Sequence, residues 1–287
     1  MTTTLATHRA RLLDGVPLTE RRMTLSGLPT AVLEGGSGPP MVLLHGPGES
    51  AVNWRWIAGD LVTTHRVVAP DLPAHGSTGS DPDRLDEEGV LEWLDALVER
   101  TCGEPAVLVG HVLGGAIATR YAVGNPRRLR ALVLVDSLGL GRFRPGIGFA
   151  STFARFTARP SERGYERFMN HCAHDLDALR ADLGADWPAF VSYNLGLARS
   201  ETASGARKLF RRVGLPRIDP GDLDRIQVPT VLIWGRHDEA LKLKIAEAAS
   251  ERHGWPLHVV EDAADDPPRD QPGAFVRALR GALDATG

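Results

Sequence analysis

The sequence predicts an α/β fold in which a mostly parallel sheet is covered by helices on both faces. Short β-branched runs alternate with amphipathic stretches, which is typical of parallel strands joined by crossover helices. The length of 287 residues suits one large α/β domain with an insertion. A hydrophobic content of 43% with 24% charged residues is ordinary for a globular chain and does not indicate a membrane protein or a fibrous protein.

Each expected element follows from its local pattern. A hairpin is expected over residues 22–34, broken by Ser26 and Gly27. Apolar residues recurring every three or four positions predict helices over residues 88–99, 114–123, 241–252 and 274–283. Six apolar, β-branched runs predict the parallel strands. These runs are residues 41–45, 66–69, 106–110, 131–135, 230–234 and 257–260.

The interval 137–227 breaks this alternation, since it has helical fragments and many aromatic residues but no convincing strand. It is therefore predicted to be a helical cap, and residues 1–136 and 228–287 to be the core. A cap over the carboxyl ends of the strands would lie where open α/β sheets bind ligands. The aromatic side chains either line that pocket or fill the interior of the cap.

Composition excludes several classes of function. A net charge of −3 with scattered basic residues gives no concentrated basic face for nucleic acid or an anionic membrane. Cys102 and Cys172 are far apart and have no metal-ligand spacing, so neither a disulfide framework nor a metal site is expected. The first residues lack the apolar run of a leader peptide, and no apolar run is long enough to span a membrane. These features predict a soluble cytoplasmic protein without a cofactor.

Residues 107–115, VLVGHVLGG, follow a strand and open a helix, and small residues surround the central position of the turn. Three more segments occur in a fixed order: HGPG at 45–48, DLPAHGS at 71–77 and WGRHD at 234–238. Together with ADDPPRDQP at 264–272, they resemble the motifs of the α/β-hydrolase superfamily, in its cap-bearing branch. The resemblance covers most of the chain outside residues 137–227.

The resemblance implies a degenerate catalytic triad. Val112 stands where the family has its nucleophile, and valine has no lone pair to attack a carbonyl. Asp265 stands at the histidine position, where an ordinary aspartate pKa of about 3.9 makes a poor proton shuttle near neutrality. The oxyanion donors would be the N–H groups of Leu113 and of position 47, but Pro47 has none, which leaves Gly48 as the alternative donor.

Four side chains are candidate acids or bases. Asp238 matches the triad acid, and it either shares a proton with Asp265 or is held by backbone N–H groups. Glu49 either points into the pocket as an acid or base or caps the following helix. His237, beside Asp238, is the histidine expected to face the pocket. Pro47, Gly48, Trp54, Val112 and Leu113 are the expected substrate contacts, although Trp54 also fits a core position.

These observations favour a cofactor-independent, non-hydrolytic enzyme, namely a lyase, isomerase or cyclase for a small, largely apolar metabolite. High use of Ala, Arg, Gly and Asp suits a GC-rich bacterial genome and a role in secondary metabolism. One alternative is a catalytically inactive ligand-binding protein. The other is an esterase with a displaced nucleophile, Ser137 or Ser77, although neither lies at an elbow.

Overall fold

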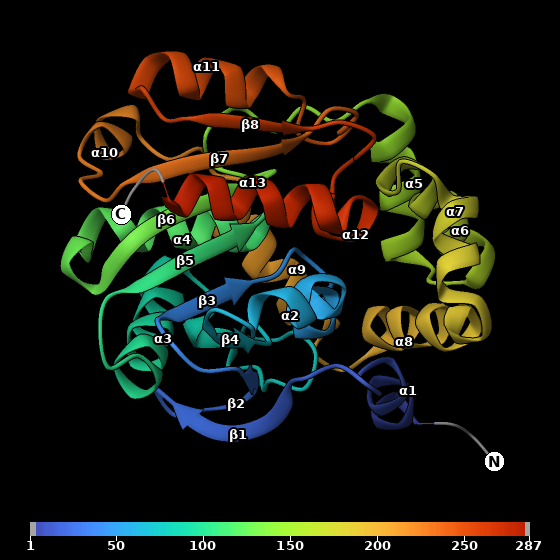
Figure 1. Ribbon diagram of the computed structural model, residues 1–287. Coiled ribbons are helices and arrows are strands. Elements are labelled where there is room, and N and C mark those ends of the chain that lie inside the picture. Colours follow the sequence, from blue (N-terminus) through green and yellow to red (C-terminus); the bar gives the residue numbers. More distant parts are fainter. Residues whose placement is uncertain (1–3, 285–287) are drawn as a thin grey trace.

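A computed structural model describes residues 4–284 and contains one eight-stranded sheet. The strand order is β1-β2-β4-β3-β5-β6-β7-β8 (Figure 1). Neighbouring strands are parallel from β4 through β3 to β8, whereas β2 pairs antiparallel with β1 and β4. The strands are β1 Thr19–Leu25, β2 Leu28–Gly35, β3 Pro40–Leu44, β4 Arg66–Pro70, β5 Ala106–His111, β6 Leu129–Val135, β7 Thr230–Gly235 and β8 Leu257–Val260.

The predicted fold class is confirmed. Each of the six predicted runs forms a parallel strand, with small shifts at its ends, because the central strands are buried on both faces and their apolar runs are continuous. The hairpin also forms. Its turn uses positive φ angles of 46° at Ser26 and 81° at Gly27, which matches the twist that tight hairpins require.

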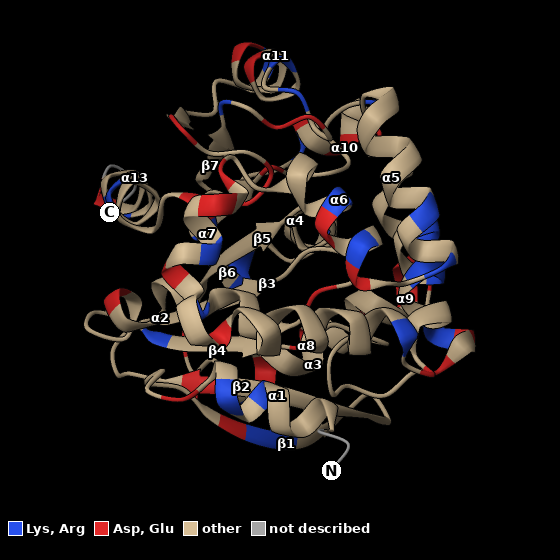
Figure 2. Ribbon diagram, turned by 90° about the vertical axis from the view of Figure 1, so that its right-hand side faces the viewer, with Lys and Arg blue, Asp and Glu red and all other residues tan. Residues whose placement is uncertain are grey.

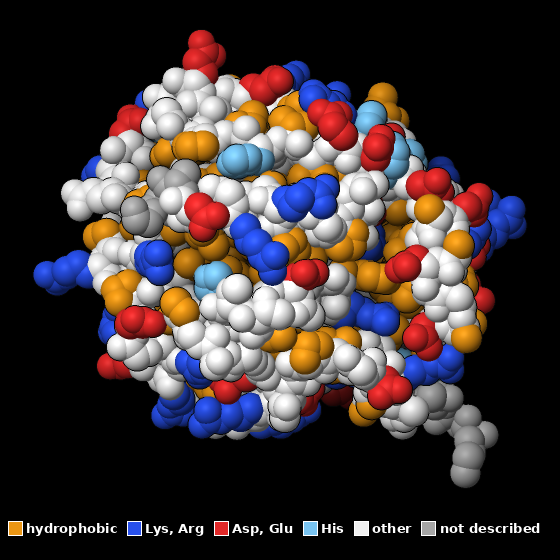
Figure 3. Space-filling view, viewed as in Figure 1, with side chains coloured by type: hydrophobic (Ala, Val, Ile, Leu, Met, Phe, Trp, Pro, Cys, Tyr) orange, Lys and Arg blue, Asp and Glu red, His pale blue; other side chains and the backbone are white. Residues whose placement is uncertain are grey.

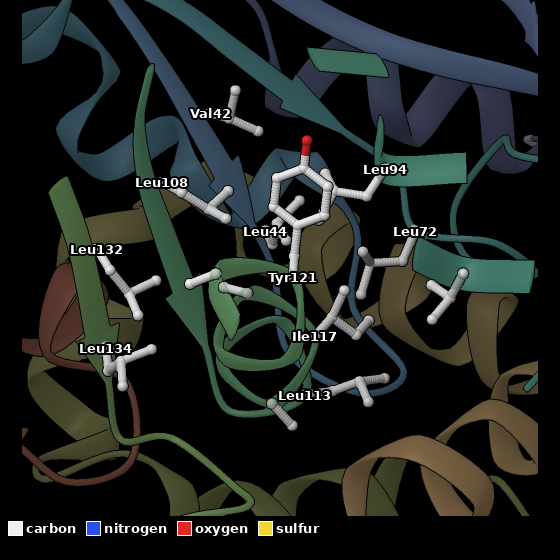
Figure 4. Packing of buried hydrophobic residues seen from close by; sticks show 14 of the residues in the cluster. Val42, Leu44, Leu72, Leu94, Leu108, Leu113, Ile117, Tyr121, Leu132 and Leu134 are labelled. Carbon is white, nitrogen blue, oxygen red and sulfur yellow. The ribbon is translucent and has the colours of Figure 1, made fainter. Parts of the chain in front are cut away.

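Helices cover both faces of the sheet (Figure 1). On one face, the largest apolar cluster joins α3 (Glu87–Thr101), α4 (Leu113–Gly124) and α11 (Lys244–His253) to the strands. Figure 4 shows Tyr121 of α4 lying among leucines of this cluster. On the other face, α2 (Arg55–Leu61) and α13 (Pro272–Asp284) form the second cluster. The elbow after β5 is thus fixed between two packed layers.

Between β6 and β7 the described chain is helical and contains no strand; we call residues 136–229 the helical insertion. Its aromatic side chains form a third apolar cluster, against which the amino-terminal helix α1 (Leu5–Leu12) also packs. The α-helices of the insertion are α5 Ile147–Ala158, α6 Glu162–Cys172, α7 Leu176–Leu183, α8 Trp187–Arg199, α9 Ala203–Leu209 and α10 Pro220–Asp224. The remaining elements are α12 Pro267–Asp270, single helical turns at Ala51–Trp54, Pro82–Arg84, Pro126–Arg128 and Gly184–Asp186, and a π-helical turn at Phe210–Gly214.

The surface carries charges of both signs. Figure 2, which looks onto the insertion, shows acidic and basic residues intermixed over its helices. The face in Figure 3 likewise alternates charged, polar and apolar side chains. Among residues 4–284, no helix is both long and apolar enough to cross a membrane.

Candidate functional site

A cavity of about 170 Å³ lies between the carboxyl ends of the strands and the helical insertion. Its core side is formed by Pro47, Gly48, Glu49, His111, Val112 and Asp265. Its insertion side is a cage of aromatic rings, many of which contact one another edge to face or stacked. These rings are Phe143, Phe149, Phe153, Phe156, Tyr165, Phe168, Phe190 and Phe210. The cavity is therefore mainly apolar; its acidic groups, Glu49 and Asp265, lie on the core side, and the insertion adds a few polar residues, among them Asn194 and Arg207.

Val112 occupies the tip of the elbow between β5 and α4. Its φ of 46° and ψ of −101° are unusual for a β-branched residue and cost about 1–3 kcal/mol. Two backbone bonds hold this conformation: the Val112 N–H donates to Val135 O at 3.0 Å, and the Leu138 N–H donates to Val112 O at 3.1 Å. The strained turn therefore persists with an aliphatic side chain at its tip.

Two glycines let the turn close. A Cβ on Gly114 would lie 2.2 Å from the carbonyl oxygen of Leu44, and a Cβ on Gly110 would lie 2.5 Å from that of Gly114. Both separations are far below van der Waals contact, so a larger residue at Gly114 would force α4 away from β3, and one at Gly110 would force α4 away from β5. The sequence pattern around the elbow is thus a packing requirement, independent of which residue stands at the tip.

A buried ion pair lies beside the elbow. His111 Nδ1 is 3.5 Å from Glu49 Oε2, and the same oxygen accepts the Gly46 N–H at 2.8 Å. The other ring nitrogen of His111 lies 2.6 Å from the carbonyl oxygen of Asp265, so Nε2 carries a proton and donates it. Trp54 packs edge-on against the His111 ring. The HGPG loop, the elbow and the Asp265 loop are joined through this one histidine.

The pair perturbs the titration of both residues. Burial disfavours the charged form of His111, but the Glu49 carboxylate outweighs burial and raises the pKa of His111 to about 10. Burial alone would raise the pKa of Glu49, yet the His111 cation lowers it to about 2. Both groups are therefore charged at neutral pH, and the protonated His111 cannot accept a proton from a substrate.

Arg269 of α12 holds a group of three carboxylates at the edge of the cavity. Its guanidinium lies 3.5 Å from Asp265, 3.2 Å from Asp266 and 3.1 Å from Asp270. It also donates to the carbonyl oxygen of Cys172 in the insertion at 2.7 Å. One cation faces three buried acids, so this group favours uptake of a proton.

Asp265 is the carboxyl of this group that lines the cavity together with Arg269. Burial raises the pKa of Asp265 well above its usual value, against the opposing effect of Arg269. Burial likewise raises the pKa of Asp266 to about 6. Cys172, which also lines the cavity, has a thiol pKa raised by burial and by Asp265, so it is a neutral and unreactive thiol at pH 7.

Asp238 shares a hydrogen bond with a second carboxyl, but this carboxyl belongs to Asp136 at the end of β6 and not to Asp265. Asp238 Oδ1 accepts the N–H groups of Ala240 and Leu241 at 2.6 and 2.7 Å. Burial and the negative charge of Asp238 raise the pKa of Asp136 well above its usual value, which places the shared proton on Asp136. Asp238 influences Asp265 through its charge, yet it does not line the cavity.

The structure separates the other predicted site residues. Pro47, Gly48, Glu49, Val112 and Asp265 meet at the cavity, as expected. Contrary to expectation, His237 lies on the surface, its ring centroid 4.7 Å from that of His174, because its loop turns outward after β7.

Contrary to expectation, Trp54 and Leu113 do not line the cavity, because their side chains are buried in the apolar clusters on the two faces of the sheet. Neither Ser137 nor Ser77 lines the cavity; the Ser137 hydroxyl is fully buried and donates to the carbonyl oxygen of Leu138.

Three important residues were missed from the sequence. His111 lines the cavity, Arg269 holds the buried acids beside it, and Asp136 pairs with Asp238. An arginine three or four residues after two adjacent aspartates was an available signal for the first turn of α12. The contact between Asp136 and Asp238 depends on the β6–β7 register and has no local signal.

Comparison with known proteins identifies the family. The family model described as alpha/beta hydrolase fold matches residues 39–265. The chain belongs to the α/β-hydrolase fold family.

Curated relatives of this α/β-hydrolase-fold chain include bacterial enzymes. It is 30% identical to a pimeloyl-[acyl-carrier protein] methyl ester esterase from Aeromonas hydrophila over 261 residues, covering 85% of this chain and 95% of that protein. It is 28% identical to the dihydrolipoyllysine-residue acetyltransferase component of an acetoin cleaving system from Pseudomonas putida. That match covers 85% of this chain but only 65% of the length of the relative.

Solved structures support the same fold. A membrane phospholipase A superposes with a TM-score of 0.82 at 23% identity, covering 98% of this chain and 91% of that one. A meta-cleavage product hydrolase superposes with a TM-score of 0.78 at 23% identity, covering 92% and 98%. At this level of identity the superpositions establish the architecture.

Proposed function

We propose that this α/β-hydrolase-fold protein binds a small, largely apolar molecule in the cavity without forming a covalent intermediate. The observation that carries the proposal is Val112 at the tip of the elbow. The side chain at this tip borders the cavity, and an aliphatic group there has no electron pair to attack a bound carbonyl. The catalytic triad is therefore degenerate at its nucleophile.

The surroundings of the elbow support this proposal. Asp265, at the histidine position of the family, is an acid bound by Arg269 and provides no imidazole to shuttle protons. In the HGPG loop, the Gly46 N–H is already bonded to Glu49, and Pro47 has no N–H. A carboxylate at this point also opposes the negative charge that ester hydrolysis develops on oxygen.

The size of the cavity limits the ligand. A cavity of about 150 Å³ lined by apolar side chains holds one benzene ring, and the cavity here is about 170 Å³. The aromatic cage favours a flat or compact apolar molecule, and Asp265 and Arg269 supply the polar contacts at one end. We expect a ligand of about one ring with a single polar substituent; neither nucleic acid nor a membrane is an expected partner.

A thermal-shift assay with toluene, phenol and benzyl alcohol as probes tests this proposal. At least one probe should raise the melting temperature, because a ligand at 100 times its Kd adds about 2.7 kcal/mol of stability. Ala203→Phe, which fills the cavity from α9, should abolish the shift. Ser204→Phe, on the exposed side of the same helix, should leave it unchanged.

Shifts that survive in Ala203→Phe, or saturable turnover of p-nitrophenyl esters by the wild-type protein, would contradict the proposal.

A second candidate function is a cofactor-independent lyase, isomerase or cyclase in bacterial secondary metabolism, and the state of Asp265 favours it. This carboxyl lines the cavity, and burial raises its pKa, so it is a neutral acid able to protonate a bound substrate. Proton transfer of this kind requires no nucleophile at position 112.

This second function is tested by incubating the protein with the metabolic intermediates made by the enzymes that neighbouring genes encode. Asp265→Asn should slow any conversion by about tenfold or more without weakening ligand binding. Asp266→Asn, whose carboxyl does not line the cavity, is the matched control. An unchanged rate in Asp265→Asn would exclude Asp265 as the proton donor, and no conversion by the wild-type protein would leave binding as the function.

A further inference from the structure

Outside the cavity, three side chains with metal-binding donors converge on the surface between the core and the helical insertion. His237 follows β7, Asp262 follows β8, and His174 lies between α6 and α7 of the insertion. One ligand atom from each lies within 4.8 Å of the others. Figure 3 shows histidine and acidic side chains next to each other on the surface near these strand ends.

We propose that His174, His237 and Asp262 bind a zinc ion that joins the helical insertion to the core. Two imidazoles and one carboxylate are a common ligand set for Zn²⁺, with water in the fourth position. Harder ions such as Mg²⁺ and Ca²⁺ prefer sets of oxygen ligands alone. The donor chemistry therefore selects zinc and related late transition metals.

The spacing of the donors fits such an ion. Ligand atoms about 2.1 Å from a tetrahedral zinc lie about 3.3 to 3.5 Å apart. His174 Nε2 is already 3.7 Å from Asp262 Oδ1, and the two imidazole centroids are 4.7 Å apart. Small rotations about the side-chain torsions of the exposed residues bring all three donors to coordinating distance.

The backbone around the three donors is held in place beforehand. Asp270 Oδ2 accepts the N–H of His174 at 3.0 Å and that of Ala264 at 2.9 Å, which ties the insertion to the loop after β8. The His237 N–H donates to Ala263 O at 2.9 Å, which ties the loop after β7 to the same segment. Three segments distant in sequence are thus fixed relative to one another, which lowers the entropy cost of assembling the site.

The position of this site connects it to the cavity. His174 follows Cys172 by two residues, and Asp262 precedes Asp265 by three, and both Cys172 and Asp265 line the cavity. A bound ion would hold these two cavity walls together. It would therefore stabilise the closed arrangement of insertion and core whatever molecule occupies the cavity.

Calorimetric titration of the full chain with zinc chloride, after treatment with EDTA and removal of any affinity tag, tests the site. We expect one ion per chain, a higher melting temperature with zinc, and a blue cobalt complex typical of tetrahedral coordination. His174→Ala and His237→Ala should each weaken binding by about tenfold or more, because each removes one of three protein ligands. His171→Ala, in the same part of the insertion but paired with Glu239, is the control.

Equal zinc affinity in wild type, His174→Ala and His237→Ala would overturn the assignment, as would the absence of stoichiometric binding by the wild-type chain. Chemical denaturation of each metal-free variant shows whether it is folded. A His237→Ala protein that is folded, as stable as the metal-free wild type and unresponsive to zinc would support the site independently of any activity.

Discussion

The elbow around Val112 and the loop around Arg269 border the same cavity, but different forces hold them. Backbone hydrogen bonds and close contacts at two glycines fix the elbow, and its tip residue contributes no charge. Buried ion pairs fix the Arg269 loop, where three acids surround one guanidinium. The comparison shows that the shape of a catalytic turn can persist without its nucleophile, whereas the neighbouring loop depends on side-chain charge.

The largest expected effect tests the dependence of the loop on charge. Arg269→Met should lower the free energy of unfolding by about 3–5 kcal/mol, because it leaves buried carboxylates without their counterion. Urea denaturation at neutral pH measures this loss. Arg236→Met, which breaks an exposed pair with Glu261, should cost far less, because water screens that pair. Similar losses in both variants would mean that charge does not hold the loop.

The ion pair between His111 and Glu49 predicts a pH dependence. The pKa of His111 is raised from 6.5 to about 10 in the folded chain, so its stabilisation is fully present below pH 6.5 and is lost as the pH rises through about 10. The free energy of unfolding should therefore decrease from pH 6.5 to pH 10. Denaturation series across this range measure the decrease.

Glu49→Gln sharpens this test. Once the carboxylate is removed, burial lowers the pKa of His111, so the loss of stability at alkaline pH should largely disappear. On the acid side, burial lowers the pKa of His45 to about 3 and that of His75 to about 4. Their contribution is present above pH 6.5 and is lost as the pH falls through these values. Glu49→Gln should not remove this acid loss, because burial causes the lowered pKa values and Glu49 only opposes them. An unchanged alkaline slope in the variant would mean that Glu49 is not the partner of His111.

A smaller effect tests the strain at the elbow. Val112→Ala removes two methyl groups but relieves part of the cost of a positive φ at a β-branched residue, so the free energy of unfolding should change by less than about 1 kcal/mol. Val109→Ala, in the extended and fully buried part of β5, should cost about 2 kcal/mol. Equal losses by urea denaturation would show that the turn stores no strain at its tip.

The smallest expected effect concerns chemistry. Val112→Ser restores a hydroxyl at the tip, but it should leave hydrolysis of p-nitrophenyl butyrate at the level of Val112→Ala. Among the described residues, the two histidines that line the cavity are poor bases at neutral pH: His111 is charged, and burial lowers the pKa of His75 to about 4. Initial rates of both variants at neutral pH measure this difference. A serine variant more than about tenfold faster would show that His111 or Asp265 replaces the missing base.

The fold could be predicted closely from the sequence, and the site only in part. The strands were predictable because a strand buried on both faces has a continuous apolar run. The elbow was predictable because its close backbone contacts require glycines at fixed positions in the sequence. His237 was misplaced because the direction of a loop after a strand depends on its tertiary contacts, here the ring of His174. The pairing of Asp136 with Asp238 also arises only when β6 and β7 lie side by side.

The backbone at position 112 is fixed by its neighbours rather than by its own side chain. A substitution there exchanges the chemical group presented to the cavity at a cost of a kcal/mol or two, while the scaffold is unchanged. This makes the position a useful handle for protein engineering: a thiol, a carboxylate or a bulky ring can be installed at the floor of the cavity in one step. The surrounding loops would then decide whether the new group reacts.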